Sequence, residues 1–188
     1  MAATDQQQRL RCGLIGCGGF GTWVTAYILE VADVLFFCDA SFEAAERARD
    51  AAAAISPPSS PPAAAAAASH ATRCFTDYRE LVAAGSNGLL DAVFIATSND
   101  SHCEISIAAC EAGLHVFCEK AMARNTKECW QMALAAEKNS VKLLVGHKRR
   151  LRRSYARMLE LMRSEELLGV SLRPASVLGL CQSSLPHH

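Results

Sequence analysis

The sequence predicts an α/β fold in which helices cover both faces of a parallel, doubly wound, six-stranded sheet. Apolar runs of strand length alternate with amphipathic stretches of helical length along most of the 188-residue chain. A glycine-rich turn follows the first apolar run, and an acidic residue ends the second. Such alternation favours parallel strands joined by right-handed crossovers, with 3-2-1-4-5-6 as the simplest strand order.

The glycine turn organises the first part of the chain. The apolar run Leu14-Ile15 enters a turn with Gly16, Gly18 and Gly21 in G-x-G-x-x-G spacing. In a dinucleotide site the first glycine permits a tight turn, the second lets the backbone approach a pyrophosphate, and the third lets the following helix pack closely on the strand. The N-terminus of that helix then faces the phosphates. The pattern predicts a dinucleotide site, with a turn that serves only packing as the alternative.

The helix after the turn is expected to lay an apolar face on the sheet. The apolar residues that recur at helical spacing, of which we interpret the aromatic ones as core, are Phe20, Trp23, Val24, Tyr27, Ile28 and Val31. A second apolar run, residues 34–38, ends in Asp39, about 20 residues beyond the turn. A carboxylate at that position can accept hydrogen bonds from both ribose hydroxyls, which supports the dinucleotide site.

The next elements are shorter. Ser41 is expected to cap a helix over residues 42–53, and residues 56–69 form a low-complexity Ala/Pro/Ser segment that we predict to be a mobile insertion. A third strand is expected at 72–75, and a brief helix at 77–84.

The second half of the chain carries polar residues after two further strands. The strand 91–96 runs into the turn Thr97 to His102, where Ser101 and Glu104 have the spacing of a capping box. The strand 114–118 ends at Glu119-Lys120. Because ligands of open α/β sheets bind at the carboxyl ends of the strands, both turns are expected on the ligand-bearing edge.

The last elements are two helices with a strand between them. Asn125 and Glu128 suggest a second capping box for a helix through Ala136, followed by a sixth strand at 142–145. A final helix is expected at 155–168, and residues 170–180 have the composition of one more strand.

Cysteine usage and hydropathy limit the class of protein. Nine cysteines are scattered without a C-x-x-C pair, which favours buried thiols in a reducing compartment over a disulfide framework or a zinc site. The first residues lack the continuous apolar segment of a secretory signal, and no apolar run approaches the ~20 residues of a membrane helix. The sequence therefore predicts a cytoplasmic protein without a membrane partner.

Basic residues gather toward the end of the chain. Residues 141–188 hold nine Lys and Arg against three Glu, a net charge of +6 that the rest of the chain balances. The run Lys148 to Arg153 raises nucleic-acid binding as an alternative class. Because no aromatic residues interleave this run to stack on bases, we predict no nucleic-acid partner.

Five motifs in order resemble a known family. They are GLIGCGGFG at 13–21, CDA at 38–40, DAVFIATSNDSHCEI at 91–105, AGLHVFCEKAMA at 112–123 and LVGHKRR at 144–150. From about residue 10 to 169, apart from the low-complexity segment, the chain resembles the glucose-fructose oxidoreductase / inositol dehydrogenase / rhizopine catabolism (Gfo/Idh/MocA) family. The resemblance implies an NAD(P)-dependent oxidoreductase that transfers a hydride between the cofactor and a sugar, cyclitol or related polyol.

The resemblance also implies a domain plan. Family members pair an N-terminal Rossmann domain with a C-terminal α/β domain that lines the substrate pocket and often mediates oligomers. On this plan residues 1–150 are the NAD(P)-binding Rossmann domain, with the insertion at about 55–69. Residues 151–188 are then a linker helix and a truncated start of the second domain. Self-association into a homo-oligomer is expected through residues 155–180.

The resemblance assigns site residues one by one. The cofactor-binding residues that it implies are Gly16, Gly18, Gly19, Phe20 and Gly21 at the pyrophosphate, Asp39 at the adenosine ribose, Thr97, Asn99 and His102 beside the adenine and nicotinamide, and Glu119 and Lys120 at a Glu-Lys-Pro motif. Lys120 and His102 are the catalytic candidates, because an ammonium beside a reacting hydroxyl stabilises the alkoxide that precedes hydride loss. No metal site is predicted. NAD is predicted over NADP, since the Asp39 carboxylate would repel a 2′-phosphate and no arginine directly follows it.

Several alternatives stay open at this point. Lys120 has an alternative role as a surface lysine or as the ion-pair partner of Glu119, and His102 as a capping or core histidine. His147 fits a structural or a pocket-lining role. Ala121 stands where the family has proline. The alternative function is a dinucleotide-binding module without turnover, acting as a sensor, a scaffold or a truncated inactive form.

Overall fold

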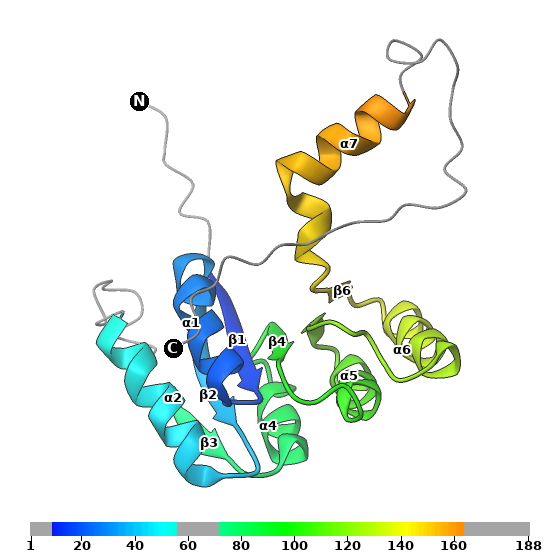
Figure 1. Ribbon diagram of the computed structural model, residues 1–188. Helices are drawn as coiled ribbons and strands as arrows, with labels where there is room; N and C mark the ends of the chain where they lie inside the picture. Colours follow the sequence, from blue (N-terminus) through cyan, green and yellow to red (C-terminus); the bar gives the residue numbers. More distant parts are fainter. Residues whose placement is uncertain (1–8, 56–71, 164–188) are drawn as a thin grey trace, which may run out of the picture. The chain divides into compact units, whose positions relative to one another are not determined.

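The computed structural model describes residues 9–55 and 72–163, and its centre is a parallel six-stranded sheet (Figure 1). The strands are β1 (Leu10–Ile15), β2 (Ala32–Cys38), β3 (Arg73–Phe75), β4 (Ala92–Ile95), β5 (His115–Cys118) and β6 (Leu143–Val145). Their order in the sheet is β3-β2-β1-β4-β5-β6, and every neighbouring pair is parallel. The predicted fold class and strand order are confirmed.

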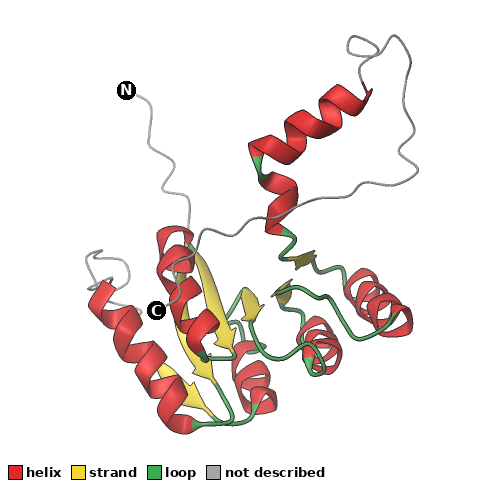
Figure 2. Cartoon of the chain, viewed as in Figure 1, coloured by secondary structure: helices red, strands yellow, loops and turns green. Residues whose placement is uncertain are grey.

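Helices connect the strands and cover both faces of the sheet (Figure 2). The helices between strands are α1 (Gly19–Val31), α2 (Phe42–Ile55), α4 (Tyr78–Gly85), α5 (His102–Glu111) and α6 (Thr126–Lys138). One core packs α1 and α2 on the sheet and contains Leu14 and Phe37, whereas the other packs α4, α5 and α6 on the opposite face and contains Phe36 and Met132. Adjacent strand residues such as Phe36 and Phe37 are both buried because the sheet is covered on both sides, so its strands read as continuous apolar runs.

The predicted core face of α1 is wrong for its aromatic residues. Trp23 and Tyr27 are each 53% exposed and Phe20 is also exposed, whereas Gly21, Thr25 and Ile28 are the buried residues of this helix. The small side chains of Gly21 and Thr25 let the helix axis approach the sheet closely. The bulky rings therefore turn outward, where Trp23 packs on both Phe20 and Tyr27, with ring centroids 5.7 and 4.8 Å apart.

Three helices begin with a side-chain cap, of which the caps at Ser41 and Asn125 were predicted. The Ser41 hydroxyl accepts a hydrogen bond from the backbone N–H of Ala44, at 3.3 Å, and Asp77 caps α4 through the backbone N–H of Arg79. Asn125 caps α6 by accepting from the N–H of Glu128, while the Glu128 carboxylate returns to Arg124 instead of closing the box on Asn125.

The predicted capping box of Ser101 and Glu104 is wrong. The Ser101 side chain makes no cap hydrogen bond to the first turn of α5. Its hydroxyl instead bonds the side chain of Thr97 at 2.8 Å and the carbonyl oxygen of Ser98 at 2.9 Å. The preceding turn offers these nearer oxygen partners, so the hydroxyl folds back on it.

The cysteines of the described part are mostly core residues. Six are buried, Cys74 and Cys129 are half-buried, and Cys181 lies outside the described residues. Burial raises the pKa of the Cys12 and Cys110 thiols to about 11 and that of Cys17, Cys38 and Cys118 to about 12. The interpretation of these residues as small buried thiols is confirmed for the six buried positions.

Contacts divide the chain into two units, at residues 1–146 and 147–188. The first contains the whole sheet. The described part of the second contains a 3-10 helix, η1 (Lys148–Leu151), and α7 (Arg153–Arg163). The predicted insertion at 56–69, the continuation of the last helix to 168 and the strand at 170–180 lie outside the described residues.

Candidate functional site

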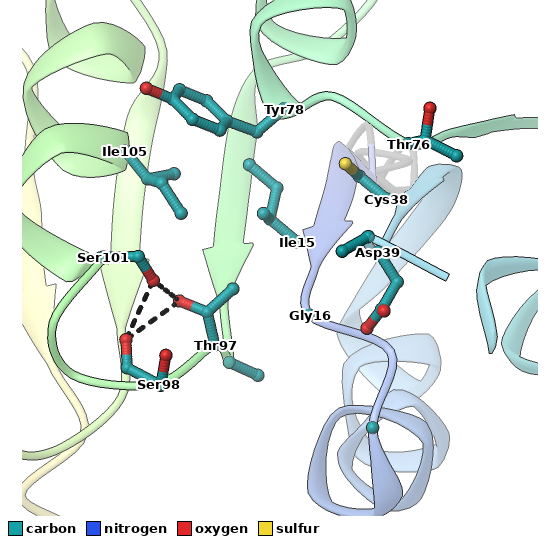
Figure 3. A pocket seen from close by; sticks show the side chains of 13 residues that line it. Ile15, Gly16, Cys38, Asp39, Thr76, Tyr78, Thr97, Ser98, Ser101 and Ile105 are labelled. Carbon is teal, nitrogen blue, oxygen red and sulfur yellow. Dashed lines mark hydrogen bonds between the residues drawn. The ribbon is translucent and has the colours of Figure 1, made fainter. Parts of the chain in front are cut away.

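A cavity of about 430 Å³ opens at the carboxyl edge of the sheet (Figure 3). The turns that follow β1, β2, β3 and β4 line it, with Gly16, Asp39, Thr76 and Thr97 as representatives of the four turns. A parallel sheet brings the carboxyl ends of its strands to one edge, and the strand order reverses direction beside β1. This is the place where open α/β sheets bind ligands.

The glycine turn is built so that only glycine fits its first position. Gly16 has a φ of +95°, and a Cβ there would lie 2.6 Å from the carbonyl carbon of Ala96. Its backbone N–H donates to the carbonyl oxygen of Cys38 at 2.8 Å, which joins the ends of β1 and β2. The required left-handed conformation and the close approach of β4 together explain the glycine.

Gly21 and Gly18 serve different purposes in the same turn. A Cβ on Gly21 would overlap the carbonyl oxygen of Gly16, so this glycine allows the close packing of α1 on β1 that its spacing predicts. Gly18 and Gly19 have no heavy atom within 4 Å of a Cβ position, and Gly18 lines the cavity. The backbone is therefore open to a ligand on this side.

The Asp39 carboxylate is oriented by the backbone at the edge of the cavity. Its Oδ2 accepts from the N–H of Cys17 at 2.8 Å, and its Oδ1 accepts from the N–H of Ser41 at 3.0 Å. Each carboxylate oxygen has further acceptor capacity, so one side of the group holds the glycine turn while the other is free for hydroxyl donors. Figure 3 shows the carboxylate beside Gly16.

The turn after β4 faces the glycine turn across the cavity. Thr97, Ser98 and Ser101 line the cavity and are linked by the hydroxyl bonds drawn in Figure 3. Ser98 and Ser101 were not predicted as site residues, although they share the turn of Thr97. Asn99 is exposed and does not line the cavity.

Thr76, Tyr78 and Ile105 also line the cavity and were not predicted as site residues. Thr76 and Tyr78 follow the carboxyl end of β3, and Ile105 lies on the first turns of α5. The shared strand edge was the available signal, since the third strand ends at the same edge as the first two. The short, polar sequence after residue 75 carries no recognisable spacing.

His102 is buried instead of facing the cavity. Its side chain has 0% exposure. Nδ1 lies 2.8 Å from the carbonyl oxygen of Ala121, and Nε2 lies 3.1 Å from that of Thr97. Both ring nitrogens are therefore engaged by the protein backbone, which leaves neither nitrogen directed at a bound molecule.

Glu119 and Lys120 follow β5 and lie outside the cavity lining. A Glu119 carboxylate oxygen accepts from the backbone N–H of Lys120 at 3.1 Å, and the carboxylate packs against Gly146 after β6. The Lys120 side chain is exposed and forms no ion pair with any residue in the ranges 9–55 and 72–163. The peptide bond between Lys120 and Ala121 is cis.

The structure thus brings part of the predicted site together. Gly16, Gly18, Asp39 and Thr97 line one cavity. The predicted site residues that do not line it are Gly19, Phe20, Gly21, Asn99, His102, Glu119 and Lys120. His147 is exposed and precedes η1 in the second unit.

Among the described residues, no group of three or more His, Cys, Asp or Glu side chains has the arrangement of a metal site. No helix in that part of the chain is long and apolar enough to cross a membrane.

Comparison with known proteins agrees with this geometry. The model of a family described as "Oxidoreductase family, NAD-binding Rossmann fold" (Gfo/Idh/MocA) matches residues 10–147. The chain is 37% identical over 142 residues to a scyllo-inositol 2-dehydrogenase (NADP(+)) of Bacillus subtilis, covering 74% of this chain and 37% of the relative. It is 25% identical over 162 residues to an inositol 2-dehydrogenase of Salmonella paratyphi B, covering 84% of this chain and 43% of the relative.

A solved structure shares the fold. The scyllo-inositol dehydrogenase of Lactobacillus casei, with bound NAD(H) and scyllo-inositol, superposes with a TM-score of 0.66 at 19% identity. The match covers 86% of this chain and 43% of that structure. The chain therefore spans less than half the length of the relatives that it matches.

Proposed function

Because the chain belongs to the Gfo/Idh/MocA family of NAD-binding oxidoreductases, we propose that residues 1–150 bind a nicotinamide dinucleotide in the cavity beside the glycine turn. The observation that carries the proposal is an open backbone at Gly18 next to the oriented Asp39 carboxylate. Open backbone accommodates a pyrophosphate, and the carboxylate accepts from hydroxyl groups. The groups that line the cavity therefore fit such a cofactor.

Each part of the cofactor has a proposed position. The glycine turn, Gly16 to Gly21 with Gly19 and Phe20, would hold the pyrophosphate at the N-terminus of α1. Asp39 would bind the adenosine ribose, and Thr97 with Asn99 would flank the rings. Glu119 would orient the turn that carries Lys120, since its carboxylate accepts from the Lys120 backbone N–H.

The proposed reaction is hydride transfer between the cofactor and a cyclitol, sugar or related polyol. Bound nicotinamide supplies the hydride acceptor or donor. In the direction of carbonyl reduction, the Lys120 ammonium, which is exposed and has no ion pair in the described ranges, would donate a proton to the substrate oxygen while the hydride goes to the carbon, which gives the alcohol. His102 has both nitrogens engaged by carbonyl oxygens, so we do not assign it a proton-transfer role. The names of the two relatives point to an inositol as the first substrate to test.

NAD is the proposed cofactor in preference to NADP. The Asp39 carboxylate would accept two hydrogen bonds from a free ribose diol and would repel a 2′-phosphate. Ala40, Ser41 and Phe42 follow it, so no cation directly offsets that repulsion. The NADP dependence in the name of the Bacillus subtilis relative makes this preference the part of the proposal most in need of a test.

Calorimetric titration of the purified chain with NADH and NADPH provides that test. We expect tighter NADH binding, because a charge-assisted hydrogen bond contributes about 1.5–3 kcal/mol. Asp39→Ala should weaken NADH binding roughly tenfold or more and narrow the difference between the cofactors. Asp50→Ala is the matched control, since Asp50 pairs with Arg49 and lies outside the cavity lining. NADPH binding tenfold tighter than NADH in the parent chain would contradict the role of Asp39.

A second candidate function is dinucleotide binding without turnover. The observation that favours it is the composition of the cavity wall, which contains Gly16, Gly18, Asp39 and Thr97 but not Lys120. Incubating the chain with NAD and a panel of inositols and sugar alcohols, while following NADH absorbance, separates the two functions. Turnover supports the oxidoreductase, and cofactor binding with no turnover across the panel supports the binding module.

The proposed compartment and partners follow the same reasoning. Six buried cysteine thiols are free, which suits a reducing compartment such as the cytoplasm. The proposed partners are the small-molecule substrate and a second copy of this chain.

A further inference from the structure

We infer that His102 is a positioning residue that ties the turn after β4 to the turn after β5 through its two ring nitrogens. The inference rests on the proposed function in one respect, because the proposed function explains what the link is for. The link would hold the turn after β4, which lines the cavity, in register with Lys120. The link itself is a matter of geometry and can be tested without a cofactor.

The two contacts come from opposite sides of the ring. Nδ1 lies 2.8 Å from the carbonyl oxygen of Ala121, the residue after Lys120. Nε2 lies 3.1 Å from the carbonyl oxygen of Thr97, which lines the cavity. β4 and β5 are neighbours in the sheet, but Ile95 and Cys118 are the last residues that pair them. Beyond those residues the two turns leave the ladder, and the His102 ring spans them.

Both partners of the ring are acceptors, so the chemistry of the contacts is specific. A carbonyl oxygen cannot donate, and each contact therefore requires an N–H on the facing nitrogen. A neutral imidazole donates to one carbonyl, and an imidazolium donates to both. An apolar side chain of similar volume fills the same space but offers no donor to either carbonyl oxygen.

Burial distinguishes this positioning role from a catalytic role and from a purely space-filling role. With 0% exposure and both nitrogens engaged, the ring is not placed to touch a substrate. A purely space-filling core residue would not need a ring nitrogen facing either carbonyl oxygen. A buried donor–acceptor link between two loops restricts how far either loop moves, and loops that carry binding groups depend on such restriction.

Amide side chains can take over one contact each. The side-chain nitrogen of asparagine occupies about the position of Nδ1, and that of glutamine about the position of Nε2. His102→Asn should therefore keep the Ala121 contact and release the Thr97 turn. His102→Gln should keep the Thr97 contact and release the Lys120–Ala121 turn. His102→Phe should release both.

Hydrogen–deuterium exchange of the full chain without cofactor tests the link. We expect exchange of residues 97–101 to rise roughly tenfold in His102→Asn, with residues 119–124 as in the parent. The reverse pattern is expected in His102→Gln. Cys110→Ala is the matched control: it removes a fully buried side chain from the same helix but leaves both turns untouched. If Asn and Gln changed the two turns equally, or if Cys110→Ala reproduced their patterns, the inference would be overturned.

The two single-contact variants keep the test valid if His102→Phe does not fold. NADH titration of the same proteins then separates the inference from the proposed function. We expect His102→Asn, which frees the Thr97 turn, to bind NADH several-fold more weakly than His102→Gln. A parent chain that binds no NADH would refute the proposed function, while the exchange patterns would still decide the role of His102.

Discussion

Gly16 and Gly18 lie two residues apart in one turn, yet a methyl group would meet different surroundings at each. At Gly16 it would meet the backbone of Ala96 and Thr97 within 2.7 Å, in a residue whose φ is +95°. At Gly18, which lines the cavity and has a φ of −66°, it would have no heavy atom within 4 Å. The fold therefore requires the first glycine, whereas the reason for the second lies in the proposed cofactor site.

Alanine substitutions should separate these two requirements. We expect Gly16→Ala to lower the free energy of unfolding by more than about 2 kcal/mol, because the positive φ and the backbone overlap both act against it. Gly18→Ala should change that free energy by no more than about 1 kcal/mol, the usual range for a helix N-cap, but weaken NADH binding at least tenfold. Urea denaturation and NADH titration measure the two quantities. If the Gly18→Ala chain bound NADH as tightly as the parent, the ligand would not approach the protein backbone closely at residue 18.

At the residue scale the sequence was most informative where spacing encodes backbone geometry. Gly16, Gly18, Asp39 and Thr97 were predicted and line one cavity. The hydroxyl of Ser101 was misassigned because a capping pattern does not reveal that Thr97 and Ser98 lie nearer. Spacing cannot show which way a ring points, so the sequence left His102 open between a catalytic role and a capping or core role, and the structure has it buried.

At the scale of elements, Arg11 and Asp91 join the starts of β1 and β4. The guanidinium makes two bonds to the carboxylate, Nη2 to Oδ1 at 2.6 Å and Nε to Oδ2 at 3.1 Å, and the Arg11 backbone N–H donates to Oδ2 at 2.8 Å. These bonds lower the pKa of the Asp91 carboxyl, chiefly through the side-chain hydrogen bond from Arg11. The pair therefore stabilises the junction of the two central strands in a pH-dependent way.

The sign of that dependence follows from the direction of the shift. A carboxyl with a lowered folded-state pKa stabilises the fold above its ordinary pKa of about 3.9, and this contribution is lost as the pH falls through the lowered value. At pH 7 we expect Asp91→Asn to cost about 1–2 kcal/mol, since both side chains are about 30% exposed and solvent weakens the pair. The difference from the parent should shrink toward zero in acid.

Urea denaturation of both proteins across the acidic range checks this prediction. Asp33→Asn is the control, because Asp33 pairs with Arg9 where both side chains are more than 40% exposed, and it should cost less than about 1 kcal/mol. A difference between Asp91→Asn and the parent that stayed constant down to strongly acidic pH would exclude an ionic contribution.

The strands were predicted correctly, whereas the buried face of α1 was predicted only in part. Strands covered on both faces, such as β2, are marked by continuous apolar runs. Helix periodicity identifies an apolar stripe but does not show which of two stripes faces the sheet. In α1 the close approach of Gly21 to the backbone of Gly16 requires that the stripe of small residues faces the sheet. Trp23 and Tyr27 are therefore surface residues.

At the scale of the whole molecule, several apolar side chains are exposed in each unit. In the first unit, Leu144 on the edge strand β6 is 61% exposed and Trp130 on α6 is 66% exposed. In the second unit, Leu151 is 88% exposed, and Tyr155 and Met158 on α7 are also exposed. Where such side chains gather into one patch, the apolar surface favours association with a partner. The predicted self-association region, 155–180, is described only as far as residue 163.

We expect the purified chain to self-associate as its concentration rises, with the sedimentation coefficient increasing accordingly. Leu151→Glu and Leu144→Lys should each shift the association to higher concentration, because each replaces exposed apolar surface with charge. Val31→Glu is the matched control: Val31 is 72% exposed but lies on α1, away from both segments in the sequence. A monomer at all concentrations would contradict the prediction, and an equal effect of Val31→Glu would indicate unspecific association.

Salt separates the two forces that can drive this association. Residues 141–188 carry a net charge of +6 and the rest of the chain −6, so two copies have opposite charges to pair. Charge pairing weakens as salt is added, since exposed charges more than about 10 Å apart are screened at 0.1 M. Contact between apolar side chains on a segment that also carries Arg152, Arg153 and Arg157 should instead strengthen, because salt screens the repulsion between like charges on the two copies. We expect the second behaviour, since removing an exposed leucine from water contributes about 25 cal/mol per Å² whatever the salt, whereas surface ion pairs contribute about 0–1 kcal/mol each. Association that disappears on adding moderate salt would show that charge pairing drives it. Leu151→Glu would then affect association only through the negative charge that it adds.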